Sequence, residues 1–267
     1  MRGLAALLLC LLPAAAAAAF AAEAVQAVQA AEYVRLPGGA FRSVLRYEDL
    51  PGTSVRVRPF ALMRIPVTNA QFLAFVKTHP QWRRDRIAAV FADREYLSQW
   101  GGPLTLGGQA PPQQPAVRVS WFAANAYCEA QGARLPMWSE WEYASAADET
   151  RRDARADPAW RARILAWYAR PSRGPLPRAG LQTANAYGIQ DLHGLVWEWT
   201  DDFSALLIAG DNRNQGDADT AEYCGAGALS MDDRENYAVM MRVALLSSLQ
   251  AQDTTRNLGF RCARDAP

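Results

Sequence analysis

The sequence predicts a single, loop-rich α+β domain, and three observations support this fold class. The chain has 267 residues, of which 50% are hydrophobic, so one domain can bury a full core. Strand-like alternation at residues 55–58 and helix-capping residues at Thr68 and Ser120 indicate both kinds of element. The nine tryptophans indicate many loops held by aromatic rings. The net charge of +1 gives no electrostatic case for nucleic acid as a partner.

Residues 1–22 have the pattern of a signal peptide that precedes a domain at residues 23–267. Arg2 supplies a positive start, an apolar run follows, and an alanine-rich stretch offers cleavage sites. A membrane anchor is the alternative, and it is disfavoured because Pro13 breaks a short apolar run. A lipoprotein interpretation through Cys10 is weak, because no small residues flank this cysteine. We expect a periplasmic or secreted protein without stable membrane insertion after signal cleavage.

Export would separate the four cysteines of the chain into two groups. Cys10 would leave with the signal, whereas Cys128, Cys224 and Cys262 would remain in an oxidising compartment. Such a compartment permits one disulfide and leaves one thiol. The spacing of the three cysteines does not assign the pair.

The first elements are predicted from turn and capping residues. Residues 33–66 indicate strands and turns, because two glycines and a proline mark the first turn. Thr68 begins a helix that ends near His79, which we expect to be solvated rather than a ligand. Ser120 begins a second helix, and Gly132 stops it.

The next helices are less regular. Ser139 and Glu142 can form a capping box for a third helix. Residues 148–163 predict a charged helix, and the prolines between residues 171 and 177 predict a linker.

Residues 185–203 form the stretch around which we expect the chain to be organised. Two tryptophans flank Glu198, and Gly194 lies between this carboxylate and Asp191. Carboxylates and main-chain carbonyls at such spacing can wrap a hard cation, and the glycine lets the backbone turn. The alternative is an aromatic core loop whose acids cap neighbouring backbone groups.

The same stretch resembles the signature of the formylglycine-generating enzyme, or sulfatase-modifying factor, family. DLHGLVWEWTDDF at residues 191–203 is similar to its core motif, and other family motifs match in order. They are LPGGAF at 36–41, PVTNAQF at 66–72, PAVRVSW at 115–121, AYC at 126–128, RLP at 134–136, EWEYA at 140–144 and NLGFRC at 257–262. The resemblance implies the family's irregular, C-type-lectin-like α+β fold.

The resemblance also implies a calcium ion and a disulfide. The calcium ligands would be the side chains of Asp191 and Glu198 and the carbonyls of Gly194 and Val196, a hard-oxygen set. Leu195 stands where the family usually has asparagine, which would change local hydrogen bonding without removing a ligand. Some members have another calcium site in the region that corresponds to residues 146–184, but here this region has no pattern of acidic side chains and carbonyls that would form it. The disulfide would join Cys128 to Cys262.

Both well-understood chemistries of the family are disfavoured. The formylglycine-generating enzymes hold copper(I) with two cysteines, and here no cysteine lies between Cys224 and Cys262. A second branch holds iron with several histidines, and this chain has only two histidines, His79 and His193. We therefore do not expect sulfatase activation or sulfoxide-synthase chemistry.

A soft-metal or redox site remains a hypothesis. Its candidate ligands are Cys224, Met231, Met240 and Met241, and copper is the candidate cofactor. The candidate catalytic residues are Cys224, His193, Arg242 and Ser247, and by analogy with the family Ser248 and Asn257 would line the same cleft. The alternative is a small buried cysteine with core methionines, without chemistry.

Two functions follow from these observations. One is an oxidoreductase or a maturation or accessory factor that acts on a periplasmic peptide, metalloprotein or metal. Exported relatives associated with copper nitrite reductase and with pyoverdine maturation are similar in kind. The alternative is a non-catalytic module on the same scaffold that binds a ligand or a protein.

Overall fold

A computed structural model describes residues 31–45, 54–169, 174–206 and 237–266, which belong to the unit Ala31–Pro267. The predicted signal peptide with Cys10, the first part of the predicted proline-rich linker, and both Cys224 and Met231 lie outside the described residues. Among the described helices, none has the length and apolar character needed to cross a membrane.

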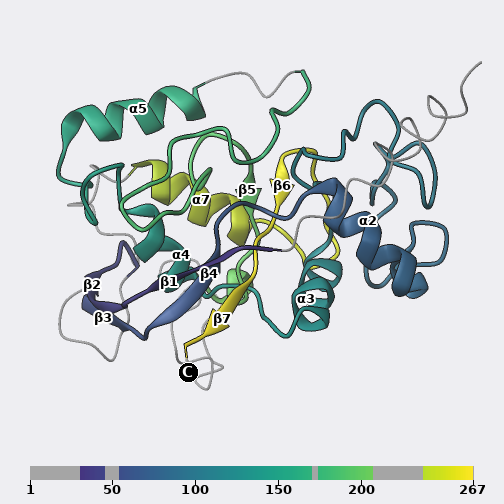
Figure 1. The fold of residues 1–267 in the computed structure, drawn as a ribbon, viewed down its shortest axis with the longest axis horizontal. Coiled ribbons are helices and arrows are strands. Elements are labelled where there is room, and N and C mark those ends of the chain that lie inside the picture. The colour runs from purple at the N-terminus through teal and green to yellow at the C-terminus, as the bar shows by residue number, and fades with distance from the viewer. Residues whose placement is uncertain (1–30, 46–53, 170–173, 207–236, 267) are drawn as a thin grey trace, which may run out of the picture. The chain divides into compact units, whose positions relative to one another are not determined.

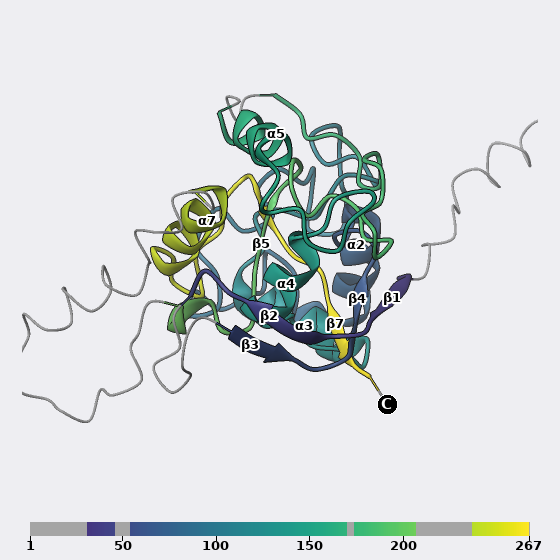
Figure 2. The same ribbon diagram turned by 90° about the vertical axis from the view of Figure 1, so that its left-hand side faces the viewer.

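Short antiparallel strands form the sheets at one end of the unit (Figure 1). The larger sheet has the order β1 (Tyr33–Leu36), β4 (Phe60–Met63), β7 (Ala263–Asp265). The second is a hairpin of β2 (Gly39–Arg42) and β3 (Ser54–Val57), which Figure 2 shows in front of the helices. Because β7 comes from the end of the chain, the last residues complete the sheet that the first described residues begin.

The helices α2 (Asn69–Thr78) and α3 (Trp121–Ala130) begin and end as their capping residues predict. Thr68 accepts from the N–H of Gln71, whose side chain accepts from the N–H of Thr68, so the two form a capping box. Ser120 caps α3, and Gly132 has a φ of +61° just beyond its end, a conformation that glycine adopts readily. The 3₁₀ turn η1 (Pro80–Trp82) follows α2.

The predicted capping box of Ser139 and Glu142 is wrong. Helix α4 (Trp138–Ser145) begins before Ser139, and the N–H of Trp138 donates to the carboxylate of Asp202 at 2.8 Å. The carboxylate of Glu140 accepts from the backbone N–H of Met137, the residue before the helix, at 2.9 Å. A local carboxylate, Glu140, and one distant in the sequence, Asp202, therefore together cap the start of α4.

The helix predicted for residues 148–163 lies further along the chain, as α5 (Pro158–Tyr168). Asp148 accepts backbone hydrogen bonds from the residues that follow it, including one from Arg151 at 2.5 Å, and this turn stops a helix from starting there. Asp157 caps α5 by accepting from a backbone N–H at 2.8 Å, and a proline occupies the first turn.

Two short strands join distant segments near the centre of the unit. β5 (Trp197–Glu198) pairs in parallel with β6 (Leu258–Gly259), as Figure 1 shows, and η2 (Phe203–Ala205) follows β5. Helix α7 (Tyr237–Ser247) packs against α5 and η2. A Cβ atom at Gly259 would lie 2.8 Å from the carbonyl oxygen of Ala116, so the close approach requires glycine there. The result is the loop-rich α+β arrangement that the sequence predicts.

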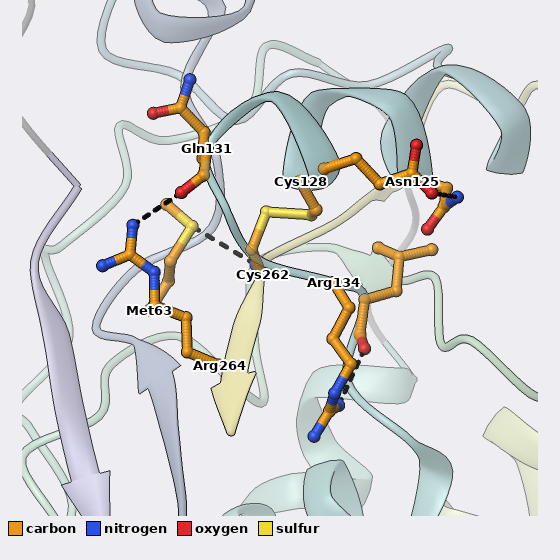
Figure 3. The surroundings of a disulfide bond; sticks show 9 residues. Met63, Asn125, Cys128, Gln131, Arg134, Cys262 and Arg264 are labelled. Carbon is orange, nitrogen blue, oxygen red and sulfur yellow. Dashed lines mark hydrogen bonds between the residues drawn. A yellow bond between two sulfur atoms is a disulfide. The ribbon is translucent and has the colours of Figure 1, made fainter. Parts of the chain in front are cut away.

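A buried disulfide joins Cys128 on α3 to Cys262 just before β7 (Figure 3). This is the pair that the family resemblance implies. The N–H of Cys262 donates to the sulfur of Met63 at 3.3 Å, and Arg264 donates to the carbonyl of Gln131 at 2.8 Å. Covalent and polar contacts thus hold the C-terminal strand to α3 and to β4.

Candidate functional site

The parallel pair of β5 and β6 places Trp197 beside Asn257. The N–H of Trp197 donates to the carbonyl of Asn257 at 2.8 Å, and the N–H of Trp199 donates to the carbonyl of Gly259 at 3.0 Å. Trp197 and Asn257 both line a cleft of about 580 Å³. The residues of the family motifs at 191–203 and 257–262 therefore meet at one surface.

This cleft, called the amide cleft here, is lined mainly by amide, arginine and aromatic side chains. Its polar lining side chains are those of Asn69, Gln99, Gln109, Gln114, Arg118, Arg256 and Asn257. Its aromatic wall consists of Trp167, Tyr168 and Trp197. No cysteine, histidine, aspartate or glutamate is among the described residues that line it. These groups can bind and orient a polar ligand, but they offer no base or nucleophile for neutral pH.

Two buried polar atoms in the lining have no hydrogen-bond partner among the described residues. They are the Oε1 of Gln99 and the hydroxyl of Tyr168. The amide orientation of Gln99 is fixed, because its Nε2 donates to the carbonyl of Val117 at 2.9 Å, which leaves Oε1 as an acceptor. Burial raises the pKa of Tyr168 to about 12, so its hydroxyl stays protonated and can donate.

The two arginines of the cleft differ in their partners. Arg118 forms an ion pair with Glu95. Arg256 is exposed and forms no hydrogen bond or ion pair with any described residue. The free guanidinium makes the described lining of the cleft positive and suits a carboxylate.

Helix α5 supplies much of the aromatic wall. The ring of Tyr168 lies 4.6 Å from that of Trp167 and 4.9 Å from that of Trp197, centroid to centroid. The sequence motifs pointed to none of these α5 residues. The available signal was the cluster of aromatic residues inside a stretch that otherwise reads as charged and solvated.

Glu198 of β5 lies in a buried polar cluster with Arg261 and the indole of Trp141. Glu198 has no exposed surface and accepts two hydrogen bonds from Arg261, at 2.7 and 2.8 Å. The indole of Trp141 donates to the same carboxylate at 2.9 Å. Both carboxylate oxygens of Glu198 therefore already have donors.

Asp191 is the second buried carboxylate of the predicted calcium set, and unlike Glu198 it forms no ion pair with an arginine among the described residues. Its backbone has a φ of +62°, and its carboxylate accepts from the N–H of Gly180 at 2.5 Å and of Gln182 at 3.4 Å. Burial, with a smaller contribution from Glu198, raises the pKa of Asp191. A cation would relieve this burial cost, so Asp191 fits calcium.

The rest of the calcium set fits calcium only in part. Glu198 would have to share its oxygens with Arg261, whereas Gly194 and Val196 would contribute only backbone carbonyls. Among the described residues, no group of three or more histidine, cysteine, aspartate or glutamate side chains converges. Calcium at these four residues stays a prediction.

Arg242 lies behind the cleft rather than in it. Its guanidinium stacks on the ring of Trp141, with Cζ 3.5 Å from the ring centroid, and donates to the carbonyl of Glu198 at 2.7 Å. Burial lowers the pKa of Arg242 to about 10, which still leaves it charged at neutral pH. Arg242 therefore supports β5 from the core and does not line the cleft.

The other candidate residues do not meet in the amide cleft. His193 lines a second cavity, and its Nε2 contacts the carbonyl of Ser145 at 2.9 Å. The hydroxyl of Ser247 is buried without a partner among the described residues, and Ser248 donates to a carbonyl of its own helix at 2.7 Å. Of the soft-metal candidates, Met240 is half-buried and Met241 is 40% exposed on α7. Asn257 lines the amide cleft, whereas Cys224, around which the resemblance implies a cleft, lies outside the described residues.

Comparisons with known proteins agree on one family. The sequence profile of the sulfatase-modifying factor enzyme 1-like domain matches residues 18–266. The chain is 33% identical to the formylglycine-generating enzyme of Streptomyces coelicolor, over 87% of this chain and 89% of that protein. It is 29% identical to the inactive C-alpha-formylglycine-generating enzyme 2 of Mus musculus, over 87% and 85%.

Two further proteins match less closely. Hercynine oxygenase of Mycolicibacterium smegmatis is 32% identical, over 62% of this chain and 44% of that protein. The solved structure of PvdO from Pseudomonas aeruginosa is 20% identical, with a TM-score of 0.46, and the match covers 88% of this chain and 95% of that one.

Proposed function

Because the chain belongs to the sulfatase-modifying factor enzyme 1-like family, we propose that it is a maturation or accessory factor that binds an extended segment of a partner protein in the amide cleft. The family match also confirms the irregular α+β fold of the formylglycine-generating enzymes. Membership alone does not decide the activity, because the relatives carry names as different as formylglycine-generating enzyme, inactive enzyme and hercynine oxygenase.

The observation that supports binding is the presence of two unsatisfied polar atoms on residues that line the amide cleft. A peptide backbone offers one N–H donor and one C=O acceptor at each residue. The Oε1 of Gln99 can accept the N–H, and the hydroxyl of Tyr168 can donate to the C=O. Each bond would relieve the cost of a buried polar group that lacks a partner in the free protein.

The remaining lining groups suit the side chains of such a segment. The rings of Trp167 and Trp197 offer an apolar surface. Arg256 has no described partner and can pair with an acidic side chain or a terminal carboxylate. We therefore propose an acidic segment with an apolar residue.

Formylglycine formation is not part of the proposal. The family's copper(I) site is expected to need two cysteines, and the sequence has none between Cys224 and Cys262. Copper bound at Cys224 and calcium bound at Asp191 remain proposals that this function does not require. The targeting pattern of residues 1–22 supports a partner outside the cytoplasm.

The test is selection from a phage-displayed library of random peptides on the purified protein. We expect acidic peptides with an aromatic or aliphatic residue to be enriched. Arg256→Gln should weaken the selected peptides and reduce the salt dependence of binding. Tyr168→Phe should weaken them by roughly tenfold without lowering the stability of the free protein, because it removes a hydroxyl that has no described partner.

Tyr33→Phe is the matched control. Tyr33 also has a buried hydroxyl, but it does not line the cleft, so the loss of this hydroxyl should leave peptide binding unchanged. Selection of no peptide, or of peptides that ignore both cleft variants, would contradict the proposal. Oxidation of a cysteine in a bound peptide, measured by mass spectrometry, would instead support an oxidoreductase.

A further inference from the structure

A second cavity of about 560 Å³ lies across Trp167 and Leu195 from the amide cleft, and both residues line both spaces. We call it the His193 cavity. Its apolar lining comes from Trp160, Ile164, Trp167, Leu181, Ile189 and Leu192. A cavity of this size, in which apolar side chains lie beside polar ones, has the form of a small-molecule site.

His193 presents a hydrogen-bond acceptor in this lining. Its Nε2 lies 2.9 Å from the carbonyl of Ser145, which can only accept, so Nε2 carries the proton. Nδ1 is therefore a bare acceptor, and it is buried with no partner among the described residues. The rings of Trp141 and Trp160 lie edge-on to the imidazole, each 5.7 Å away between centroids, and hold its orientation.

Three of the charged side chains that line the cavity are in ion pairs: Asp148 pairs with Arg151, and Arg163 pairs with Glu149 at 2.9 Å. Asp191 instead accepts from the backbone N–H groups of Gly180 and Gln182, and Arg178 donates to the side chain of Gln113 at 3.5 Å. Among the described lining residues, the buried side-chain polar atom that lacks a partner is Nδ1 of His193. This acceptor beside the apolar part of the lining suits one hydrogen-bond donor on an otherwise apolar group.

We propose that the His193 cavity binds a planar aromatic group that carries one N–H or O–H donor, with the donor on Nδ1 of His193. The ring would lie against Trp160 and Trp167, whose faces and edges favour aromatic partners. The group can belong to a free indole or phenol, or to a tryptophan or tyrosine of a bound peptide. This inference does not depend on the peptide function of the amide cleft.

The test uses indole and 1-methylindole, which differ in the N–H donor. The full chain labelled with ¹⁵N-histidine has only two histidines, so their ring nitrogens can be followed individually. We expect indole to shift the Nδ1 resonance of His193 and to leave His79 unchanged. Calorimetry should show 1-methylindole to bind roughly tenfold more weakly, because it leaves Nδ1 unsatisfied.

His193→Phe keeps a ring and removes the acceptor, so it should bind both compounds equally, whereas His79→Phe should behave as the wild type. The peptides Gly-Trp-Gly and Gly-Tyr-Gly distinguish a side chain from a free ligand, because only a cavity open to a chain would accept them. Equal wild-type affinity for both indoles, or an Nδ1 resonance that indole does not move, would overturn the proposal and assign the atom to a water molecule. The wild-type comparison stands even if the variant fails to fold.

Discussion

Glu198 and Arg261 form a two-hydrogen-bond ion pair in which neither side chain has any exposed surface. The remaining donors of Arg261 are used by three backbone carbonyls, those of Met63, Arg64 and Gln190. The pair therefore joins β5, the C-terminal segment, the end of β4 and the segment before Asp191. A buried pair is tolerated only when its other polar atoms are satisfied in this way.

Removal of one partner should be far more damaging than removal of both. Arg261→Met leaves a buried carboxylate without its cation, and we expect a loss of about 3–5 kcal/mol in the free energy of unfolding. The double variant Glu198→Gln with Arg261→Met should recover part of this loss. Urea unfolding of the wild type, the two single variants Glu198→Gln and Arg261→Met, and the double variant gives the coupling energy between the two side chains.

The surface pair of Glu95 and Arg118 is the control for this cycle. The side chain of Glu95 is 53% exposed, so Glu95→Gln should cost less than about 1 kcal/mol. Equal losses for the buried and the surface pair would contradict the structural role given to Glu198 and Arg261.

The disulfide should stabilise the protein strongly, because Cys128 and Cys262 are separated by 134 residues. In the chain-entropy model, closure of so long a loop stabilises by about 4–5 kcal/mol, and natural disulfides contribute about 2–5 kcal/mol. The double variant Cys128→Ser with Cys262→Ser should lower the urea midpoint accordingly. Cys224→Ser is the control, and its midpoint should equal that of the wild type measured in the same buffer; a reductant should lower both midpoints, because both proteins carry the disulfide.

Glu142 should make the stability depend on pH near neutrality. Burial raises the pKa of Glu142 from 4.5 to about 7, against the opposing effect of hydrogen bonds from Ser43, Val44 and Trp138. A carboxyl with a higher pKa in the folded state binds its proton more tightly there. Its contribution to stability is therefore complete below about pH 4.5 and is lost as the pH rises to about 7, a difference of roughly 3 kcal/mol.

Urea unfolding between about pH 4.5 and pH 8 measures this effect. Glu142→Gln cannot ionise, so the stability of the wild type relative to this variant should fall across that range. Glu129→Gln changes an exposed carboxylate on α3 and serves as the control. Curves for wild type and Glu142→Gln that run parallel would show that burial of this carboxyl does not control the pH dependence.

Calcium should raise the melting temperature if the set of Asp191, Gly194, Val196 and Glu198 binds it. Saturation a hundredfold above the dissociation constant stabilises a folded protein by about 2.7 kcal/mol. We expect a rise of several degrees that Asp191→Asn abolishes and Asp201→Asn, which changes an exposed carboxylate, does not. An unchanged melting temperature in wild type would retire the calcium prediction and leave Asp191 as a partner of backbone N–H groups.

Helix ends were predictable where the capping partner is local. Thr68 and Gln71 satisfy each other across one turn, so the signal lies within four residues of sequence. At the start of α4, the cap from Glu140 is local, but the cap from Asp202 was not predictable in this way, because Asp202 is 64 residues from Trp138. Which acid reaches which free N–H depends on the tertiary structure.

The amide cleft shows the same limit for function. The motif residues Trp197 and Asn257 could be singled out from the resemblance, and they do line the cleft. Gln99, Tyr168 and Arg256 come from separate segments, and glutamines and arginines are ordinary surface residues in a sequence. Their significance lies in missing partners, which only the folded structure reveals.

The C-terminal segment has a consequence for how the protein is made. Residues 258–265 contain β6, β7, Cys262 and Arg261, so they supply a strand to each of two sheets, one half of the disulfide and the cation for Glu198. Within the domain, these residues are synthesised last. A nascent chain therefore cannot complete the domain before residue 265 has been made, and we expect a stop codon placed shortly before residue 258 to leave a product for proteases rather than a shortened domain.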